Sequence, residues 1–380
     1  MLDLNSLRRE FHERFSGTPR IFRAPGRVNL IGEHTDYNDG FVLPIAIDRA
    51  CYVLAQSRAD RTLRIHSKQF NETMEFALDA PRGPEHTWSD YVRGVAWALA
   101  EAGCPPTGAD LLIASEVPLG SGLSSSAAIE VATAFALLGV ASHTLERKPI
   151  ALACQRAENE FVGMRCGIMD QLTACFGREG HALLIDCRSL DIAPVPFDES
   201  RVRAVVANTM VKHALAASEY NARRRECEDA AARFGVRALR DVSWQNIASV
   251  AAAWPENVRA RARHVTTENT RVSAAADALR RGDFNEMGRL MAASHKSLDE
   301  DYQVTCDELN AMVALAGELP GCFGARMTGG GFGGCTVNLV NVSDADSFAS
   351  ALAVSYERAT GLRPEIFICR SAPAASELWT

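Results

Sequence analysis

A short run of glycine and serine could bind phosphate. The sequence Gly-Ser-Gly-Leu-Ser-Ser-Ser follows a strand-like segment, 110–117, and leads into a helix-like segment that ends at Gly139. Backbone N–H groups in such a turn, at the start of a helix, are typical of an anion site. The serine hydroxyls could also bind phosphate or magnesium, although serine is a favoured cap of any helix. The residues of this loop are Gly120, Ser121, Gly122, Leu123, Ser124, Ser125 and Ser126.

Two common nucleotide-binding motifs are excluded. A P-loop needs a lysine directly after a glycine, and none of the four lysines in the chain follows a glycine. A second glycine-rich stretch, 327–334, contains GxGxxG, but the residues after it, CTVNLV, are expected to form a strand. A dinucleotide-binding fingerprint must lead into a helix instead. We therefore expect this stretch to pack closely against another loop or a ligand.

The segment GRVNLIGEHTD, 26–36, concentrates polar side chains that could hold a ligand. Two carboxylates and a histidine stand close together, and each ionised carboxylate can accept from two hydroxyl groups. This combination resembles a clamp for sugar hydroxyls. Taken singly, the same residues could be helix caps, a buried histidine and a structural ion pair. The candidates are Arg27, Asn29, Glu33, His34 and Asp36.

The segment 157–171 carries two further acids. Glu158 falls on an expected amphipathic helix, 148–161, beside its apolar stripe, and Asp170 falls at the start of the next expected helix. An acid near a helix N-terminus stays ionised readily, as a general base or a charge anchor requires. The ordinary alternatives are an exposed helix charge for Glu158 and an N-cap for Asp170.

The composition excludes several classes of protein. The chain has 380 residues, 47% hydrophobic and 23% charged, with a formal charge of −7, so no basic field predicts binding to nucleic acid or a membrane. The eleven cysteines have no zinc-type spacing, and the N-terminal segment MLDLNSLRREFHERF lacks an apolar signal core. The longest apolar run, 131–141, is too short to cross a bilayer. We expect a cytoplasmic protein with free thiols and no obligate protein partner.

Strand-like and helix-like segments are mixed without a regular βαβ repeat, which favours an α+β fold over a doubly wound sheet. The length allows two domains, which we predict at 1–200 and 201–380. Strands are expected at 20–25, 50–58, 61–67, 74–78, 110–117, 182–187, 203–208, 335–340 and 364–370. Helices are expected at 87–103, from the Gly/Ser loop to 139, and at 148–161, 170–176, 218–264 and 283–298.

Taken together, these segments resemble the GHMP small-molecule kinases. GRVNLIGEHTDYN (26–38) is similar to the sugar signature of the branch that phosphorylates galactose. PLGSGLSSSA (118–127) is similar to the ATP-binding motif of the family, and MTGGGFGGC (327–335) to its third motif. Further similar stretches, in the order of the family and over nearly the whole chain, are 166–171, 218–228 and 294–309.

The resemblance implies an α/β N-terminal domain, a ferredoxin-like C-terminal domain and an active site between them. It implies transfer of a phosphoryl group from ATP to the anomeric hydroxyl of galactose, with Mg²⁺ held by Ser126 and Glu158. Gly120 to Ser126 would wrap the ATP phosphates. Asp170 would contact the anomeric hydroxyl as the base, beside Arg27, which would stabilise the acceptor and the moving phosphoryl group. The residues implied for the sugar are Glu33, His34, Thr35, Asp36, Asp170 and Tyr220.

Two alternatives stay open from the sequence. A sister kinase could act on N-acetylgalactosamine or arabinose, although the HTDYN form of the first motif favours galactose. A sugar sensor on the same fold is a second alternative, but such relatives lose part of the Ser-Ala segment, and Ser126-Ala127 is intact here. One stretch, NTMVKH at 208–213, departs from the commoner Asn-Ser-Asn-Val-Arg-His of the family, close to Tyr220 in sequence.

Overall fold

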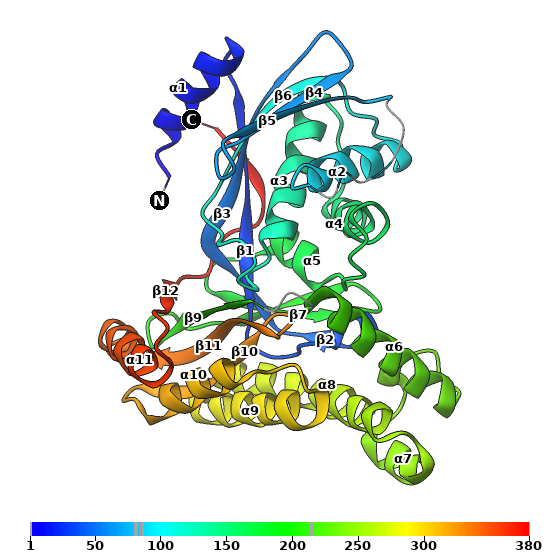
Figure 1. Ribbon diagram of the computed structural model, residues 1–380, viewed down its shortest axis with the longest axis vertical. Helices are drawn as coiled ribbons and strands as arrows, with labels where there is room; N and C mark the ends of the chain where they lie inside the picture. Colours follow the sequence, from blue (N-terminus) through cyan, green and yellow to red (C-terminus); the bar gives the residue numbers. More distant parts are fainter. Residues whose placement is uncertain (1, 80–82, 84, 86, 213–215, 380) are drawn as a thin grey trace.

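The computed structural model describes residues 2–379 except 80–82, 84, 86 and 213–215. An upright sheet with helices on both sides stands on a second layered unit that lies across its base (Figure 1). The helices and strands are mixed as expected for an α+β protein. No helix in the described part of the chain is long and apolar enough to cross a membrane.

The upright sheet has six strands. The β4–β6 pair is parallel, and the other neighbouring pairs are antiparallel. The last strand of the chain pairs with β1, so the C-terminal end returns to the N-terminal sheet. The strands, in spatial order, are β13 (Ser376–Leu378), β1 (Arg20–Asn29), β3 (Pro44–Ser57), β6 (Ala109–Ser115), β4 (Thr62–Ser67) and β5 (Glu72–Ala77).

Helices cover both faces of this sheet. On one face α3 packs against β1 and β3, and its side chains are buried on nearly all sides because α2, α4 and α5 surround it. On the other face α1 inserts Leu7 and Phe11 against the sheet. The helices are α1 (Leu4–Phe15), α2 (Asp90–Glu101), α3 (Ser125–Val140), α4 (Arg147–Arg156) and α5 (Met169–Phe176), and a π-helix, η2 (Ala157–Val162), continues α4.

The lower unit is built on a four-stranded antiparallel sheet. Its order, β10-β11-β9-β12, with helices after the first and third strands in sequence, is the ferredoxin-like arrangement that the family resemblance implied. The strands are β9 (Val202–Lys212), β10 (Cys322–Thr328), β11 (Gly333–Asn341) and β12 (Glu365–Cys369). The helices are α6 (Ala216–Phe234), α7 (Trp244–Ala248), α8 (Glu256–Arg281), α9 (Phe284–Ser297), α10 (Asp307–Glu318) and α11 (Ala345–Thr360), and a π-helix, η5 (Leu298–Tyr302), follows α9.

A small third sheet, β2 (Phe41–Val42), β7 (His181–Asp186) and β8 (Asp191–Pro196), lies at the junction of the two units, where α8 contacts β2 and β8. The predicted domain boundary near residue 200 falls in the loop between β8 and β9 and stays a prediction.

Every strand expected from the sequence is present, some of them longer than expected. The glycine-rich stretch 327–334 leads into β11, which confirms that it is not a dinucleotide-binding turn. The expected helix 148–161 is present, and its last part, residues 157–162, is a wider π-helical turn. The sequence patterns did not predict α1, α10, α11, β8, β10 and β13.

Candidate active site

A cavity of about 530 Å³ opens where the N-terminus of α3, the start of α5 and the loop 329–332 meet. Most of the residues singled out from the sequence line it: Arg27, Glu33, His34, Asp36, Gly120, Gly122, Ser124, Ser125, Ser126, Glu158, Asp170 and Tyr220. Four others do not. Asn29 donates its side-chain amide to Glu33. Thr35 donates its hydroxyl to the carbonyls of Gly32 and Phe41, Ser121 donates to the Pro118 carbonyl, and Leu123 is buried in the core.

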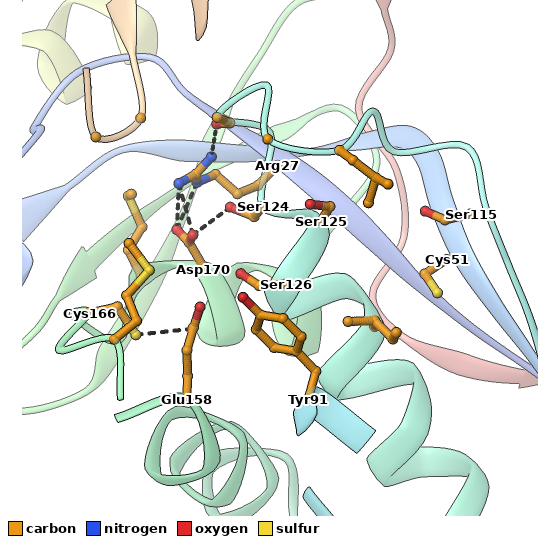
Figure 2. Close-up of a pocket in the computed structure, with 18 of the residues that line it drawn as sticks. Arg27, Cys51, Tyr91, Ser115, Ser124, Ser125, Ser126, Glu158, Cys166 and Asp170 are labelled. Carbon is orange, nitrogen blue, oxygen red and sulfur yellow. Dashed lines mark hydrogen bonds and ion pairs between the residues drawn. The ribbon is translucent and has the colours of Figure 1, made fainter. Parts of the chain in front are cut away.

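The centre of the cavity wall is an ion pair between β1 and α5 (Figure 2). Arg27 Nε donates to Asp170 Oδ1 at 2.8 Å, and Nη2 donates to Oδ2 at 2.9 Å. Nη1 of the same guanidinium donates to the Gly122 carbonyl at 2.5 Å. Ser124 Oγ completes the group by donating to Asp170 Oδ2 at 2.5 Å. The carboxylate is thus fixed in orientation, while its side chain keeps 25% exposure toward the cavity.

These contacts correct the ordinary alternatives for two residues. Ser124 precedes α3, but it has a left-handed φ of 60° and its side chain makes no capping bond. Its hydroxyl goes to Asp170 instead. Asp170 does not cap α5 either, because Ile168 occupies the N-cap position and Asp170 lies in the first turn. Both side chains therefore line the cavity and do not cap a helix.

The glycine-rich loops pack against each other, as expected for the third motif. A Cβ added at Gly329 would lie 3.0 Å from the carbonyl oxygen of Gly122, and one added at Gly122 would lie 3.1 Å from the Thr328 carbonyl oxygen. Both glycines also have left-handed φ values, 88° and 80°. A side chain at either position would therefore be strained as well as crowded. Helix α3 begins directly after this packed loop, at Ser125, and a helix N-terminus attracts anions.

Glu158 lines the cavity near Ser126 and Asp170 (Figure 2). The wide π-helical turn places this residue inward, with 4% exposure, so the alternative of an exposed helix charge is wrong. Gln171 Nε2 donates to Glu158 Oε2 at 2.8 Å, and Cys166 Sγ donates to the same oxygen at 3.1 Å. Burial raises the pKa of Glu158, and the charge of Asp170 adds to that rise, whereas the Cys166 and Ser126 hydrogen bonds oppose it.

At the polar end of the cavity Glu33 is held by three hydrogen-bond donors and by the cation of Arg326. Asn29 Nδ2 and Arg326 Nη2 reach Oε2 at 2.8 and 2.5 Å. Thr328 Oγ1 and the Gly329 N–H reach Oε1 at 3.2 and 3.0 Å. Burial raises the pKa of Glu33, and the Arg326 charge opposes that rise. Glu33 therefore ties β1 to β10 and the third-motif loop, in addition to lining the cavity.

Asp36 and His34 complete this end. Burial and the neighbouring charge of Asp170 raise the pKa of Asp36 to about 6. Burial lowers the pKa of His34 well below its usual value, so the imidazole is neutral at pH 7. His34 Nδ1 lies 2.8 Å from the Tyr37 hydroxyl, and its ring lies 5.4 Å from that of Tyr220. A neutral imidazole, a phenol and carboxylates can together donate to and accept from several hydroxyl groups.

The glycine at position 167 makes room for Asp36. A Cβ added there would lie 1.9 Å from Asp36 Oδ2. No pattern in the sequence predicted this contact, because it joins Asp36 to a loop more than a hundred positions away.

Sequence reasoning also missed the apolar end of the cavity beyond Ser125. Side chains from β3, β6, α3 and nearby loops line it, and only Leu119 among them belongs to a motif. They are Cys51, Phe70, Trp88, Ile113, Leu119 and Ile129. Phe70 stacks on Trp88 with ring centroids 5.8 Å apart and an interplanar angle of 14°. A flat, mostly apolar compartment of this kind suits an aromatic base.

Family models match three parts of the chain. Residues 9–57 match the galactokinase galactose-binding signature, residues 90–178 the N-terminal domain of GHMP kinases, and residues 275–357 their C-terminal domain. The structure of Methanococcus jannaschii mevalonate kinase, 19% identical, covers 94% of this chain and 99% of its own with a TM-score of 0.68. That likeness concerns the fold. The fold and the site define a GHMP-type small-molecule kinase, which depends on ATP.

More similar proteins narrow this class. Galactokinase of Roseiflexus sp. (strain RS-1) is 49% identical over 379 residues, 98% of this chain and 96% of its own. Galactokinase of Chloroflexus aggregans is 48% identical over 384 residues, 99% and 98% of the two chains. The crystal structure of Lactococcus lactis galactokinase complexed with galactose, 34% identical, covers 99% of this chain and 100% of its own with a TM-score of 0.94. The chain belongs to the galactokinase family.

Proposed function

We propose that this kinase transfers the γ-phosphoryl group of ATP to the anomeric hydroxyl of α-D-galactose, and that Arg27 and Asp170 form its transfer centre. The observation that carries the assignment of these residues is their ion pair. It lies between the Gly/Ser loop and the polar end of the cavity. The products are galactose 1-phosphate and ADP.

The polar end of the cavity is the place for the sugar. Asp36, His34 and Tyr220 face it, together with Glu33, and their chemistry matches a ligand with several hydroxyl groups. Asp170 borders the same end, so an anomeric hydroxyl bound there would lie against its carboxylate. We assign Thr35 a supporting role through its bonds to the Gly32 and Phe41 carbonyls, which shape this segment.

The nucleotide occupies the rest of the cavity in this proposal. The base fits the compartment of Phe70 and Trp88, and the phosphates follow the backbone from Gly120 to Ser126 toward Arg27. Helix α3 begins at Ser125, so its positive end faces the phosphates. The γ-phosphoryl group would then meet the sugar hydroxyl beside the ion pair.

The reaction forms a bond between the anomeric oxygen and the γ-phosphorus and breaks the bond from that phosphorus to the oxygen shared with ADP. The hydroxyl proton passes to Asp170. Phosphoryl transfer needs mainly positioning and charge compensation. Arg27 supplies positive charge beside the oxygen that attacks, and its bonds to the Gly122 carbonyl and to Asp170 fix the guanidinium in place.

The residues near Glu158 fit a magnesium ion. A carboxylate and a hydroxyl, from Glu158 and Ser126, are the oxygen ligands that Mg²⁺ prefers, and Mg²⁺ commonly takes one or two protein groups together with substrate phosphates. Among the described residues no cluster of three His, Cys, Asp or Glu side chains could hold a metal alone. When bound, the ion would neutralise charge on the phosphates. We place the reaction in the cytoplasm, where all eleven cysteines, which are free, stay reduced.

An ADP-release assay with a panel of acceptors tests the proposal. The purified protein is given Mg-ATP and, separately, galactose, N-acetylgalactosamine, arabinose, glucose, mevalonate or homoserine. We expect galactose to give the highest kcat/KM, with galactose 1-phosphate as the product by ³¹P NMR. A higher kcat/KM for another acceptor would replace galactose as the substrate. Binding of galactose without ADP release would identify a sensor and overturn the proposal.

A further inference from the structure

A buried carboxylate that does not line the cavity is joined to Glu158 through a single amide group. Gln171 Nε2 donates to Glu130 Oε2 at 3.0 Å and to Glu158 Oε2 at 2.8 Å. Glu130 and Gln171 have no exposed surface, and Glu158 has 4%. An amide NH₂ group has two hydrogens, so this contact uses both of them. The orientation of Gln171 is therefore set from two sides.

The three side chains come from the elements that build the phosphate end of the site. Glu130 lies on α3 one helical turn after Ser126, on the same face of the helix. Gln171 follows Asp170 in α5, and Glu158 lies in η2. Figure 2 shows the carboxylate of Glu158 directed toward Ser126 and the cavity. The Gln171 amide is thus a brace between α3, the helix that follows the Gly/Ser loop, and the π-helical turn that carries Glu158.

Burial of the Glu130 carboxyl group costs folding free energy unless the group forms hydrogen bonds, since burial penalises its charged form. Burial raises the pKa of Glu130 well above its usual value, and the charge of Glu158 adds to the rise. The hydrogen bond shows that Glu130 gives Gln171 an acceptor oxygen, which a neutral amide side chain could also provide. Without an acceptor there, the amide would be free to turn away from Glu158.

We propose that Glu130 is a positioning residue for the phosphate and metal end of the site, acting through Gln171 on Glu158. The inference rests on the proposed function, in which Glu158 and Ser126 hold Mg²⁺. Groups that orient a metal ligand from behind typically change metal affinity about 10- to 100-fold when they are removed. Substitution of Glu130, which lies outside the cavity, should therefore change the affinity of the site for the metal ion.

The test compares Glu130→Ala with Glu130→Gln, which keeps an acceptor oxygen. The first readout is binding of Mn²⁺ to the complex with ADP, followed by electron paramagnetic resonance without galactose. The second is the Mg²⁺ concentration for half-maximal rate. We expect Glu130→Ala to weaken Mn²⁺ binding about tenfold and to raise the Mg²⁺ concentration for half-maximal rate about tenfold. The KM for galactose should change less than about twofold. We expect Glu130→Gln to stay within about twofold of the unsubstituted protein in both readouts.

Two results would overturn the inference. One is Mn²⁺ binding in Glu130→Ala equal to that of the unsubstituted protein. The other is an equal loss in Glu130→Gln and Glu130→Ala, which would assign the effect to the acid itself. Failure of the unsubstituted protein to bind Mn²⁺ with ADP would instead overturn the metal assignment of the proposed function, and with it the inference.

A variant on the other side of the amide covers the case in which Glu130→Ala does not fold. Gln171→Leu removes the brace itself, and we expect the same tenfold weakening, within a factor of about three, in Mn²⁺ binding. Unchanged binding in that variant would also overturn the inference. The matched control is Thr133→Val, because Thr133 is equally buried on α3 and its hydroxyl has no hydrogen-bond partner among the described residues. We expect its metal dependence to be unchanged.

Discussion

Arg27 and Asp170, 143 positions apart in the sequence, form a two-armed ion pair with N–O distances of 2.8 and 2.9 Å. One partner comes from β1 of the upright sheet and the other from the first turn of α5. The pair also receives Ser124 from the loop before α3, so three segments that are separate in sequence meet at one carboxylate. In the proposed reaction, the sugar hydroxyl and the γ-phosphoryl group meet beside this carboxylate.

The buried pair of Glu33 and Arg326 should be the strongest electrostatic link between β10 and the segment that follows β1. Both side chains are almost fully buried, with Nη2 and Oε2 2.5 Å apart. Arg326→Met would leave the Glu33 carboxylate buried without its cation, and we expect the free energy of unfolding to fall by about 3–5 kcal/mol in urea denaturation.

A double-mutant cycle isolates that link. In a Glu33→Gln background, Arg326→Met should lower the free energy of unfolding by about 1 kcal/mol less, or by a still smaller amount, because no charge is left unpaired. Strictly additive losses would mean that the two side chains do not stabilise each other.

Sugar affinity should depend on the ionisation of Asp36. Its pKa is about 6 in the free protein, and hydroxyl groups donate to the charged form. Above pH 7 the carboxylate is already ionised, so kcat/KM for galactose should be flat. Below pH 6 it should fall, approaching about tenfold per pH unit, since one proton must leave before the sugar binds.

The pH profile of Asp36→Asn is the control, because this variant should bind galactose weakly and lose the fall between pH 5 and 6. Nucleotide affinity, measured by fluorescence titration over the same range, should change much less than kcat/KM for galactose. A profile of the unsubstituted protein that stays flat down to pH 5 would contradict the role of Asp36.

Gly167→Ala should weaken galactose binding. The new methyl group would lie 1.9 Å from Asp36 Oδ2, so the carboxylate must move or the loop must shift. We expect the KM for galactose to rise about tenfold, which corresponds to the usual 1–3 kcal/mol of overpacking.

Gly317→Ala is the matched control for Gly167→Ala, because nothing lies within 4 Å of a Cβ at that helical position. Its KM for galactose should be unchanged, and its stability equal or slightly higher. Equal KM values for the two variants would show that Gly167 makes no room for Asp36.

Met210 lies in the stretch that departs from the commoner family pattern, and its backbone has a left-handed φ of 64°. The same stretch continues to Lys212 and His213, of which His213 lies outside the described residues. A left-handed conformation costs a residue such as methionine about 1–2 kcal/mol, whereas asparagine tolerates it. We therefore expect Met210→Asn to raise the free energy of unfolding by about 1 kcal/mol in urea denaturation.

Val354→Asn is the control for replacing an exposed apolar side chain by an amide, since Val354 is exposed on α11. It should leave the free energy of unfolding unchanged or lower it slightly. A loss of stability in Met210→Asn as large as in the control would contradict the conformational argument.

The sequence predicted the parts of the site that depend on local patterns. The Gly/Ser loop, the acids of 26–36 and Asp170 stand in motifs, and a strand, a loop and a helix start are recognisable around them. It also predicted the strand after the third motif, because CTVNLV alternates in a way that a helix does not.

The remainder depends on contacts between distant segments. β10 carries Gly324 and Arg326 inside an otherwise apolar run, so its pattern did not predict a strand, and with it the partner of Glu33 was missed. The π-helical turn that brings Glu158 inward has the same composition as an ordinary helix. Apart from one leucine, the compartment of Phe70 and Trp88 follows no motif, because any large apolar side chains would build it.

Single-turnover phosphorylation of galactose by Asp170→Asn tests the central claim most directly. The variant keeps the shape of the side chain but loses its charge and its ability to take a proton. In a rapid-quench measurement with ATP and galactose bound, we expect galactose 1-phosphate to form at least about a hundredfold more slowly, while the Kd for ATP stays within about threefold. Formation at the unsubstituted rate would remove Asp170 from the transfer step and contradict the account.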